Sequence, residues 1–204
     1  MRKLIVAVMV SLRASFKGTV VQTRTAAAAS PTVGGRGRTP ATNAMDGLFA
    51  RPFALVLGRR TYDIFASFWP QVASDAPHGH IADAFTGADK HVATHHADTL
   101  DWPHSHALGA DLADALRELK HGVGPDLVSQ GSSNFTHPLL ATDIVDELRL
   151  LIYPMVLGRG ERLFADATQS SALRLASSRA TPSGVLVSRY LRDGDVRTGS
   201  FASD

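Results

Sequence analysis

The sequence predicts an α/β fold with a mostly parallel central sheet of about eight strands, antiparallel C-terminal strands and about four helices. Two observations predict it. Short apolar runs alternate with helical periodicity over most of the chain, whereas the last quarter holds strand-like runs with no long helix between them. Because 44% of the 204 residues are hydrophobic and 20% are charged, we expect one domain, residues 1–204, with a well-filled core.

The alternating part supplies the parallel strands and the helices. A strand covered on both faces reads as a continuous apolar run, and four such runs are expected as strands at residues 3–12, 53–57, 91–94 and 126–129. Helices are expected at residues 61–68, 81–85 and 111–121. The helix at 111–121 is the clearest, because its leucines recur at helical spacing and Gly122 follows it.

The last quarter supplies the antiparallel strands. Residues 147–153, 172–178 and 185–191 are strand-like and are separated by turn signals. Their apolar residues, Leu186 and Val187 among them, are many for an exposed sheet edge, and such edges are usually covered. We therefore expect a homodimer.

Composition limits the compartment and the chemistry. The chain has no cysteine, which excludes disulfides, thiolate metal ligands and cysteine nucleophiles. The opening MRKLIVAVMVSL resembles a short signal peptide, but no small-residue cleavage site follows, so we interpret it as a buried strand and expect a cytoplasmic protein. The nine histidines lack any recognised ligand spacing, and we expect no metal site.

Residues 13–44 differ from the rest of the chain. No Asp or Glu occurs before Asp46, while Arg, Thr, Ala and Gly dominate. A structureless stretch of this length is uncommon inside a compact domain. Three interpretations are open: a mobile functional loop, a basic arm, or a segment that does not belong to the fold. Its few large apolar residues predict poor order.

A first candidate binding turn follows the run FALVL. Gly58 permits a tight turn, and the helix that begins there presents free N–H groups and a positive dipole end to an anion. Arg59 and Arg60 add charge and forked donors, and Thr61 adds a hydroxyl. The alternative is an ordinary strand-to-helix turn with solvated arginines.

A second candidate turn follows the strand at 126–129. Gly131, with Ser132, Ser133 and Asn134 after it, lets the backbone approach a pyrophosphate closely. The alternative is a Ser or Asn helix cap. Because both turns follow parallel-type strands, they are expected at the same sheet edge, where open α/β sheets bind ligands. Together they favour nucleotide binding.

Other nucleotide and hydrolase motifs are missing. The sequence contains no G-x-G-x-x-G after the first strand, no G-x-x-x-x-G-K-[ST] and no G-x-S-x-G. The site, if nucleotide-binding, is therefore not of the common Rossmann or P-loop type.

Several segments resemble a known family in order and spacing. They are FALVL-GRRTYDIF, HVAT, SQGSSN and DELRLLIYPMVLGRGERLF. The sequence resembles the dihydrofolate-reductase-like fold, specifically the reductase domain of the bifunctional riboflavin-biosynthesis deaminase-reductase and its stand-alone relatives. The resemblance implies NADPH as hydride donor and a pyrimidine- or pteridine-like heterocycle as acceptor. It also favours dimers.

The resemblance assigns roles by position. The cofactor phosphates would be met by Gly58, Arg59, Arg60 and Thr61, the adenosine 2′-phosphate by Thr94 and His95, and the pyrophosphate by Gly131, Ser132, Ser133 and Asn134. The substrate pocket would be bordered by Ile152, Tyr153 and Pro154.

The sequence departs from the family after the first strand. Relatives have Ser-Leu-Asp-Gly there, whereas Ser11-Leu12 is followed by Arg13. Asp46 is the candidate proton donor, with a solvated surface acid as the alternative. We therefore expect weak or absent reductase activity. Two other functions stay open: a nucleotide-binding protein without chemistry, and a nucleic-acid binder that uses the basic residues 34–38.

Overall fold

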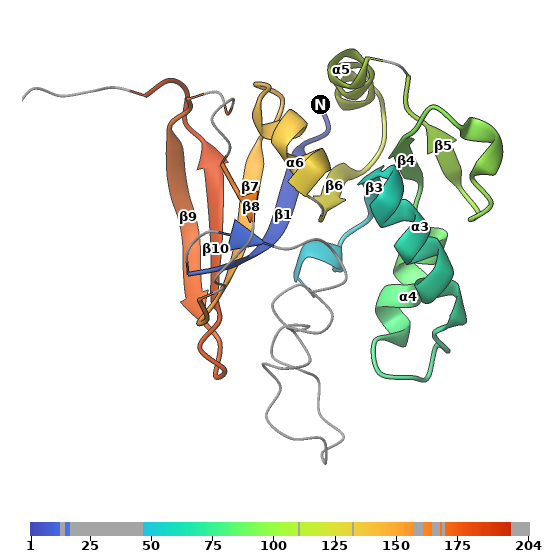
Figure 1. Cartoon of the computed structure of the whole chain (residues 1–204), viewed down its shortest axis with the longest axis horizontal. Helices are drawn as coiled ribbons and strands as arrows, with labels where there is room; N and C mark the ends of the chain where they lie inside the picture. The colour runs from blue at the N-terminus through green and yellow to red at the C-terminus, as the bar shows by residue number, and fades with distance from the viewer. Residues whose placement is uncertain are drawn as a thin grey trace, which may run out of the picture.

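A computed structural model describes residues 1–12, 15–16, 47–109, 111–131, 133–156, 161–164, 168 and 170–196. An eight-stranded sheet organises the chain, in the order β5-β4-β3-β6-β1-β7-β10-β9 (Figure 1). The strands in chain order are β1 (Leu4–Ser11), β3 (Phe53–Gly58), β4 (Lys90–Ala93), β5 (Ser105–Ala107), β6 (Asp126–Gln130), β7 (Glu147–Tyr153), β9 (Leu173–Ala180) and β10 (Leu186–Arg192).

The sheet is mostly parallel, as predicted. Strands β5, β4, β3, β6, β1 and β7 pair in parallel, and β10 runs antiparallel to both β7 and β9. One detail of the prediction is wrong, because β7 was expected among the antiparallel strands and instead pairs in parallel with β1. Strand β5 was not predicted, since it has three residues that are largely exposed.

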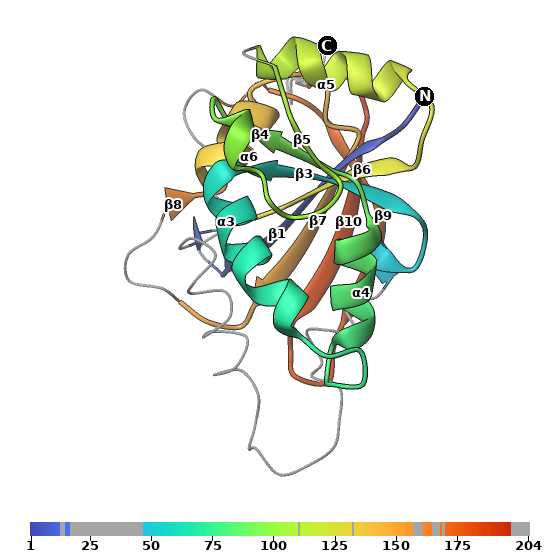
Figure 2. The ribbon, with the colours of Figure 1, turned by 90° about the vertical axis from the view of Figure 1, so that its right-hand side faces the viewer.

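Helices lie on both faces of the sheet (Figure 2). They are α3 (Arg59–Phe68), α4 (Gly79–Gly87), α5 (Leu112–His121) and α6 (Ser133–Leu140). Side chains alternate along β1, so Ile5 and Ala7 join a core with α3 and α4, while Leu4 and Val6 join a core with α5 and α6. Burial on both faces explains the continuous apolar run that predicted this strand.

A buried lysine fixes the β4–β5 side of the sheet. Lys90 is fully buried, and its ammonium donates to the carbonyls of Thr86, Ala88 and Pro103 at 3.0, 2.7 and 2.9 Å. The ammonium also lies 4.4 Å from the ring centroid of Trp102. Its three donors are therefore satisfied, and they connect the end of α4 to the chain that leads into β5.

Most of the segment 13–44 lies outside the described residues. Its residues Ser15–Phe16 form strand β2, which pairs with β8 (Glu161–Arg162) in a separate two-stranded sheet. The basic residues 34–38 and the candidate proton donor Asp46 also lie outside the described residues. Among the helices that are described, none is long and apolar enough to cross a membrane.

Candidate functional site

The predicted binding turns lie at the carboxyl ends of three adjacent strands. Strand β3 pairs in parallel with β4 on one side and with β6 on the other. Gly58, Thr94 and Gly131 are at or just beyond the ends of these three strands, so the sheet brings the turns to one edge. Helix α3 begins directly after β3, and α6 begins shortly after β6 (Figure 2).

Gly58 allows the two helix starts to approach each other. A Cβ atom on this residue would lie 3.0 Å from Cβ of Phe135, which belongs to the first turn of α6. The φ angle of Gly58 is −71°, which any residue can adopt, so space and not backbone conformation requires the glycine. The N-termini of both helices are therefore close together, and each supplies free N–H groups and a partial positive charge.

Gly131 is required for a different reason. Its φ angle of 113° lies in a region that side chains rarely allow, and the residue is buried. The hydroxyl of Thr136 donates to the Gly131 carbonyl at 3.0 Å, which fixes the turn into α6. Asn134 is exposed in the first turn, Ser133 is described for its backbone only, and Ser132 lies outside the described residues.

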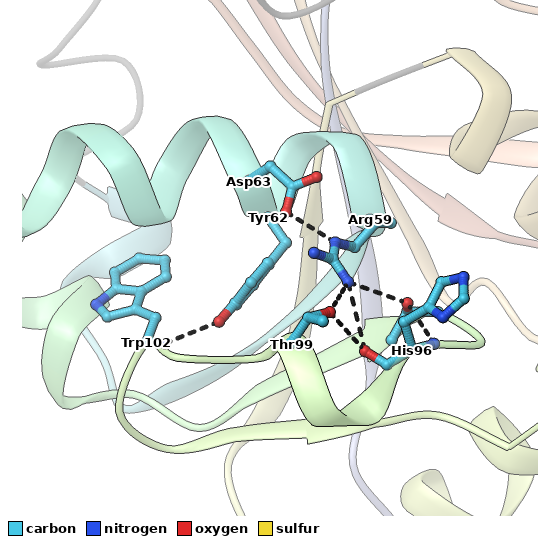
Figure 3. A network of polar contacts seen from close by, with 7 residues as sticks. Arg59, Tyr62, Asp63, His96, Thr99 and Trp102 are labelled. Carbon is cyan, nitrogen blue, oxygen red and sulfur yellow. Dashed lines mark hydrogen bonds and ion pairs between the residues drawn. The ribbon is translucent and has the colours of Figure 1, made fainter.

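Arg59 holds the loop that follows β4 (Figure 3). Its guanidinium donates to Asp63 at 2.7 Å, to the Thr99 hydroxyl at 2.5 Å, and at 3.4 Å to both the Thr94 hydroxyl and the His96 carbonyl. The Thr94 hydroxyl also accepts from the His96 amide at 3.1 Å. Arg59 is thus engaged within the protein and determines where the Thr94 turn lies.

The same loop is attached to α3 a second time. The buried Tyr62 hydroxyl accepts from the Trp102 amide at 2.9 Å (Figure 3). Arg60, next to Arg59 in α3, and His95 and His96, after β4, are exposed, so their side chains are available to an incoming group. At this edge the loop after β4 is held in place by Arg59 and Tyr62, and the charged Arg60 side chain is exposed.

Two buried polar atoms at this edge have no partner among the described residues. They are the hydroxyl oxygen of Thr61, whose residue is 1% exposed in the first turn of α3, and the amide oxygen of Gln130, the last residue of β6. An unpaired buried polar group is costly, so such atoms mark places where a ligand group can bind. Gln130 was not predicted as a site residue. The sequence feature that could have indicated Gln130 is a long polar side chain at the end of an apolar strand.

The three predicted substrate residues do not come together on one surface. Tyr153 packs with the α3 and α4 core, and its hydroxyl lies 3.8 Å from the Met9 sulfur. Burial raises the pKa of Tyr153. Ile152 points to the opposite face and packs with the α5 and α6 core, while Pro154 is exposed beyond the strand. Because side chains alternate along a strand, Tyr153 is the one of these three residues that faces the α3 side of β7.

The family follows from a comparison of the whole sequence. The profile of the RibD C-terminal domain family matches residues 3–187. The chain belongs to the RibD C-terminal domain family. The uncharacterized protein YyaP of Bacillus subtilis (strain 168) is 24% identical over 140 residues, which is 69% of this chain and 74% of YyaP.

Solved structures share the fold of this RibD C-terminal domain protein. A putative riboflavin biosynthesis protein from Shewanella sp. PV-4 has a TM-score of 0.65 and 17% identity, over 94% of this chain and 99% of that one. A pyrimidine reductase-like protein from Corynebacterium diphtheriae has a TM-score of 0.54 and 16% identity, over 95% and 93%. Acinetobacter baumannii RibD has a TM-score of 0.58 and 12% identity, with 95% of this chain matching 58% of RibD. At these identities the likeness is one of fold, and it agrees with the dihydrofolate-reductase-like architecture that the sequence resembles.

Proposed function

We propose that this protein is an NADPH-dependent reductase that acts on a pyrimidine- or pteridine-like heterocycle. The reaction is that of a 5-amino-6-(5-phosphoribosylamino)uracil reductase or of a dihydrofolate reductase. Family membership supports the reductase class, and one of the structural relatives is described as pyrimidine reductase-like. When bound, NADPH supplies the hydride.

One observation carries the proposal: two helix N-termini meet at adjacent strand ends around Gly58. Phe135 packs closely on Gly58, so the backbone N–H groups of the two helix starts are near each other and suit a pyrophosphate, as in other open α/β sheets. The unpartnered oxygens of Thr61 and Gln130 fit a polar ligand at the same edge. The residues therefore suit a dinucleotide, and Thr61 with the backbone at Gly131 would hold its phosphates.

Discrimination for NADPH is assigned to the β4 side of the edge. Thr94 and His95 follow β4, and the exposed Arg60 lies in the first turn of α3. Arg60 is free of the contacts that engage Arg59 with the loop, so it is the better candidate to bind a 2′-phosphate. A charge-assisted hydrogen bond of this kind is worth about 1.5–3 kcal/mol.

The proton required by reduction is assigned to Asp46. Hydride addition to a carbon–nitrogen double bond places an electron pair on nitrogen, which must accept a proton. Asp46 immediately precedes helical residues 47–49, in which Leu48 packs into the α3 and α4 core. Asp46 itself lies outside the described residues.

The test is a fluorescence titration with NADPH, followed by turnover assays on a panel of pterins and aminopyrimidines. NADPH binding and substrate-dependent loss of NADPH absorbance support the reductase. A second candidate function, NADPH binding without catalysis, is favoured by Arg13 at the position where relatives have Asp. Binding without turnover on every heterocycle would favour that second function. Absence of NADPH binding would contradict both.

A further inference from the structure

A strongly charged groove lies away from the carboxyl ends of the strands. It has a volume of about 610 Å³ and is lined by residues of β1, β6, β7, β9 and β10 and by the segment 47–53 that leads into β3. Lys3, Asp126 and Glu147 lie at the starts of their strands, so the groove is at the amino end of the parallel sheet. Figure 1 shows β9 and β10 on the opposite side of the molecule from α3 and α4. This volume is in the range of small-molecule sites, about 300–1,000 Å³.

Positive charge dominates the lining of this groove. Its ionisable side chains are five cations and two carboxylates: Lys3, Arg51, Arg149, Arg179 and Arg189, with Asp126 and Glu147. Ser177 of β9 and Ser188 of β10 add hydroxyl groups. A concave surface with excess charge of one sign concentrates ligands of the opposite sign.

Glu147 organises the two central arginines. Arg149 and Arg189 are directly opposite each other in the β7–β10 register, which would be repulsive without a counter-charge. The Glu147 carboxylate, 1% exposed, binds Arg149 at 2.5 Å and Arg189 at 2.7 Å. Burial opposes ionisation, but the hydrogen bonds from Arg189 and Arg149 outweigh it, and the pKa of Glu147 is lowered. The carboxylate stays charged and holds both guanidinium groups in place.

The Glu147 carboxylate accepts from only one nitrogen of each arginine. Their side chains keep 24% and 38% exposure, and Nε of Arg189 is buried with no acceptor in the part of the chain that the structure describes. A guanidinium has five donors in a rigid fork that matches phosphate oxygens. Two fixed forks, flanked by further cations, suit an anion that carries more than one charge.

We propose that this groove binds a small phosphorylated molecule, through Arg149 and Arg189 at its centre and Lys3 and Arg51 at its rim. The site is separate from the nucleotide edge, which lies at the carboxyl ends of β3, β4 and β6. The proposal does not depend on the reductase function. Glu147 positions the two arginines, and their two guanidinium groups suit an anion that carries more than one charge.

The test uses inorganic pyrophosphate as the probe in calorimetric titrations of the full chain at low ionic strength. The Arg189→Gln variant is expected to bind about tenfold more weakly, and Arg51→Gln several-fold more weakly, because each loses charge at the site. The control is Arg117→Gln on α5, outside the groove lining, which removes the same charge and should leave the affinity within twofold.

A second set of titrations separates this groove from the nucleotide edge. With saturating NADPH present, pyrophosphate affinity for the groove should be unchanged. The proposal would be overturned if the unmodified chain did not bind pyrophosphate. It would also be overturned if Arg51→Gln and Arg189→Gln bound pyrophosphate as tightly as the unmodified chain, or if NADPH displaced pyrophosphate fully. Circular dichroism checks folding. If Arg189→Gln does not fold, the exposed Arg51→Gln decides alone.

Discussion

Phe135 of α6 packs directly on Gly58, which precedes α3, and this contact brings together the two helix starts of the candidate cofactor edge. A Cβ atom at position 58 would lie 3.0 Å from Cβ and 3.2 Å from Cγ of Phe135, and both atoms are close to the buried core. Gly58→Ala should therefore move α6 away from α3, lower the free energy of unfolding by about 1–3 kcal/mol and weaken NADPH binding. Urea unfolding and NADPH titration measure the two effects.

Gly87→Ala is the matched control for this substitution. A Cβ atom at Gly87, at the end of α4, would meet nothing within 4 Å. Unfolding free energy and NADPH affinity should stay close to those of the unmodified protein. If Gly58→Ala has the same unfolding free energy and NADPH affinity as this control, the close contact between α3 and α6 is required neither for stability nor for NADPH binding.

Lys90 is expected to be among the most important polar residues for stability. Lys90→Met keeps the length of the side chain but loses the cation–π contact with Trp102 and leaves the carbonyls of Thr86, Ala88 and Pro103 without this donor. The loss in unfolding free energy should be roughly 2–4 kcal/mol, from unsatisfied buried acceptors. Denaturant unfolding measures it. Lys3→Met removes an exposed lysine and should change stability by under ~0.5 kcal/mol; equal losses would contradict the role of Lys90.

His91 should make stability depend on pH. Burial, the charge of Arg2 and the nearby His106 lower the pKa of His91 from 6.5 to about 4. Between these values the unfolded chain binds a proton that the folded chain does not, so the unfolding free energy falls as the pH falls from 6.5 to 4. The slope from this group is at most about 1.4 kcal/mol per pH unit.

The contribution of His91 is isolated by comparison with His91→Gln. The variant should lose stability less steeply over this pH window, while above pH 6.5 the two curves should run parallel. Thermal unfolding at several pH values checks this. Identical slopes would show that His91 titrates alike in the folded and unfolded chain.

The homodimer was expected from Leu186 and Val187, but these lie on β10, which is covered by β9 and is not the sheet edge. We propose the homodimer on the edge strand β9. All eight of its residues are exposed, Leu173 and Leu175 among them, and an uncovered edge strand favours association with another chain. Light scattering at tens of micromolar should give a dimer mass, and Leu173→Glu/Leu175→Glu should give a monomer. Val123→Glu, at an exposed site beyond α5, should leave the mass unchanged. A monomeric unmodified protein would contradict the proposal.

Most of the sheet could be predicted from the sequence, because its central strands are buried on both faces. The runs at β1, β3 and β6 are continuous and apolar, and Gly58 and Gly131 end them visibly. Strand β5 could not be predicted, since its three residues are polar or small and largely exposed. The direction of β7 depends on its pairing with β1, which no local pattern of residues 147–153 contains.

The polar residues of the site were harder to predict than its glycines. Arg59 has the same appearance in the sequence as Arg60, yet one is bound to the Thr94–Thr99 loop and the other is exposed. Lys90 and Gln130 are polar residues at the ends of strands. The burial of Lys90 depends partly on the carbonyl of Pro103, and the amide oxygen of Gln130 has no partner in the described part of the chain, so neither local sequence shows its role. Ile152 and Tyr153 were expected together at the substrate pocket, but they lie on opposite faces of β7, because side chains alternate along a strand.

The most direct test of the central claim, that the strand-end edge binds NADPH, is a paired titration with NADPH and NADH. The two cofactors differ only in the 2′-phosphate, which Arg60 and the Thr94–His95 turn are proposed to bind. NADPH should bind about tenfold or more tightly than NADH, and Arg60→Gln should reduce this preference while leaving NADH affinity unchanged. Equal affinities for the two cofactors, or binding of neither, would contradict the account.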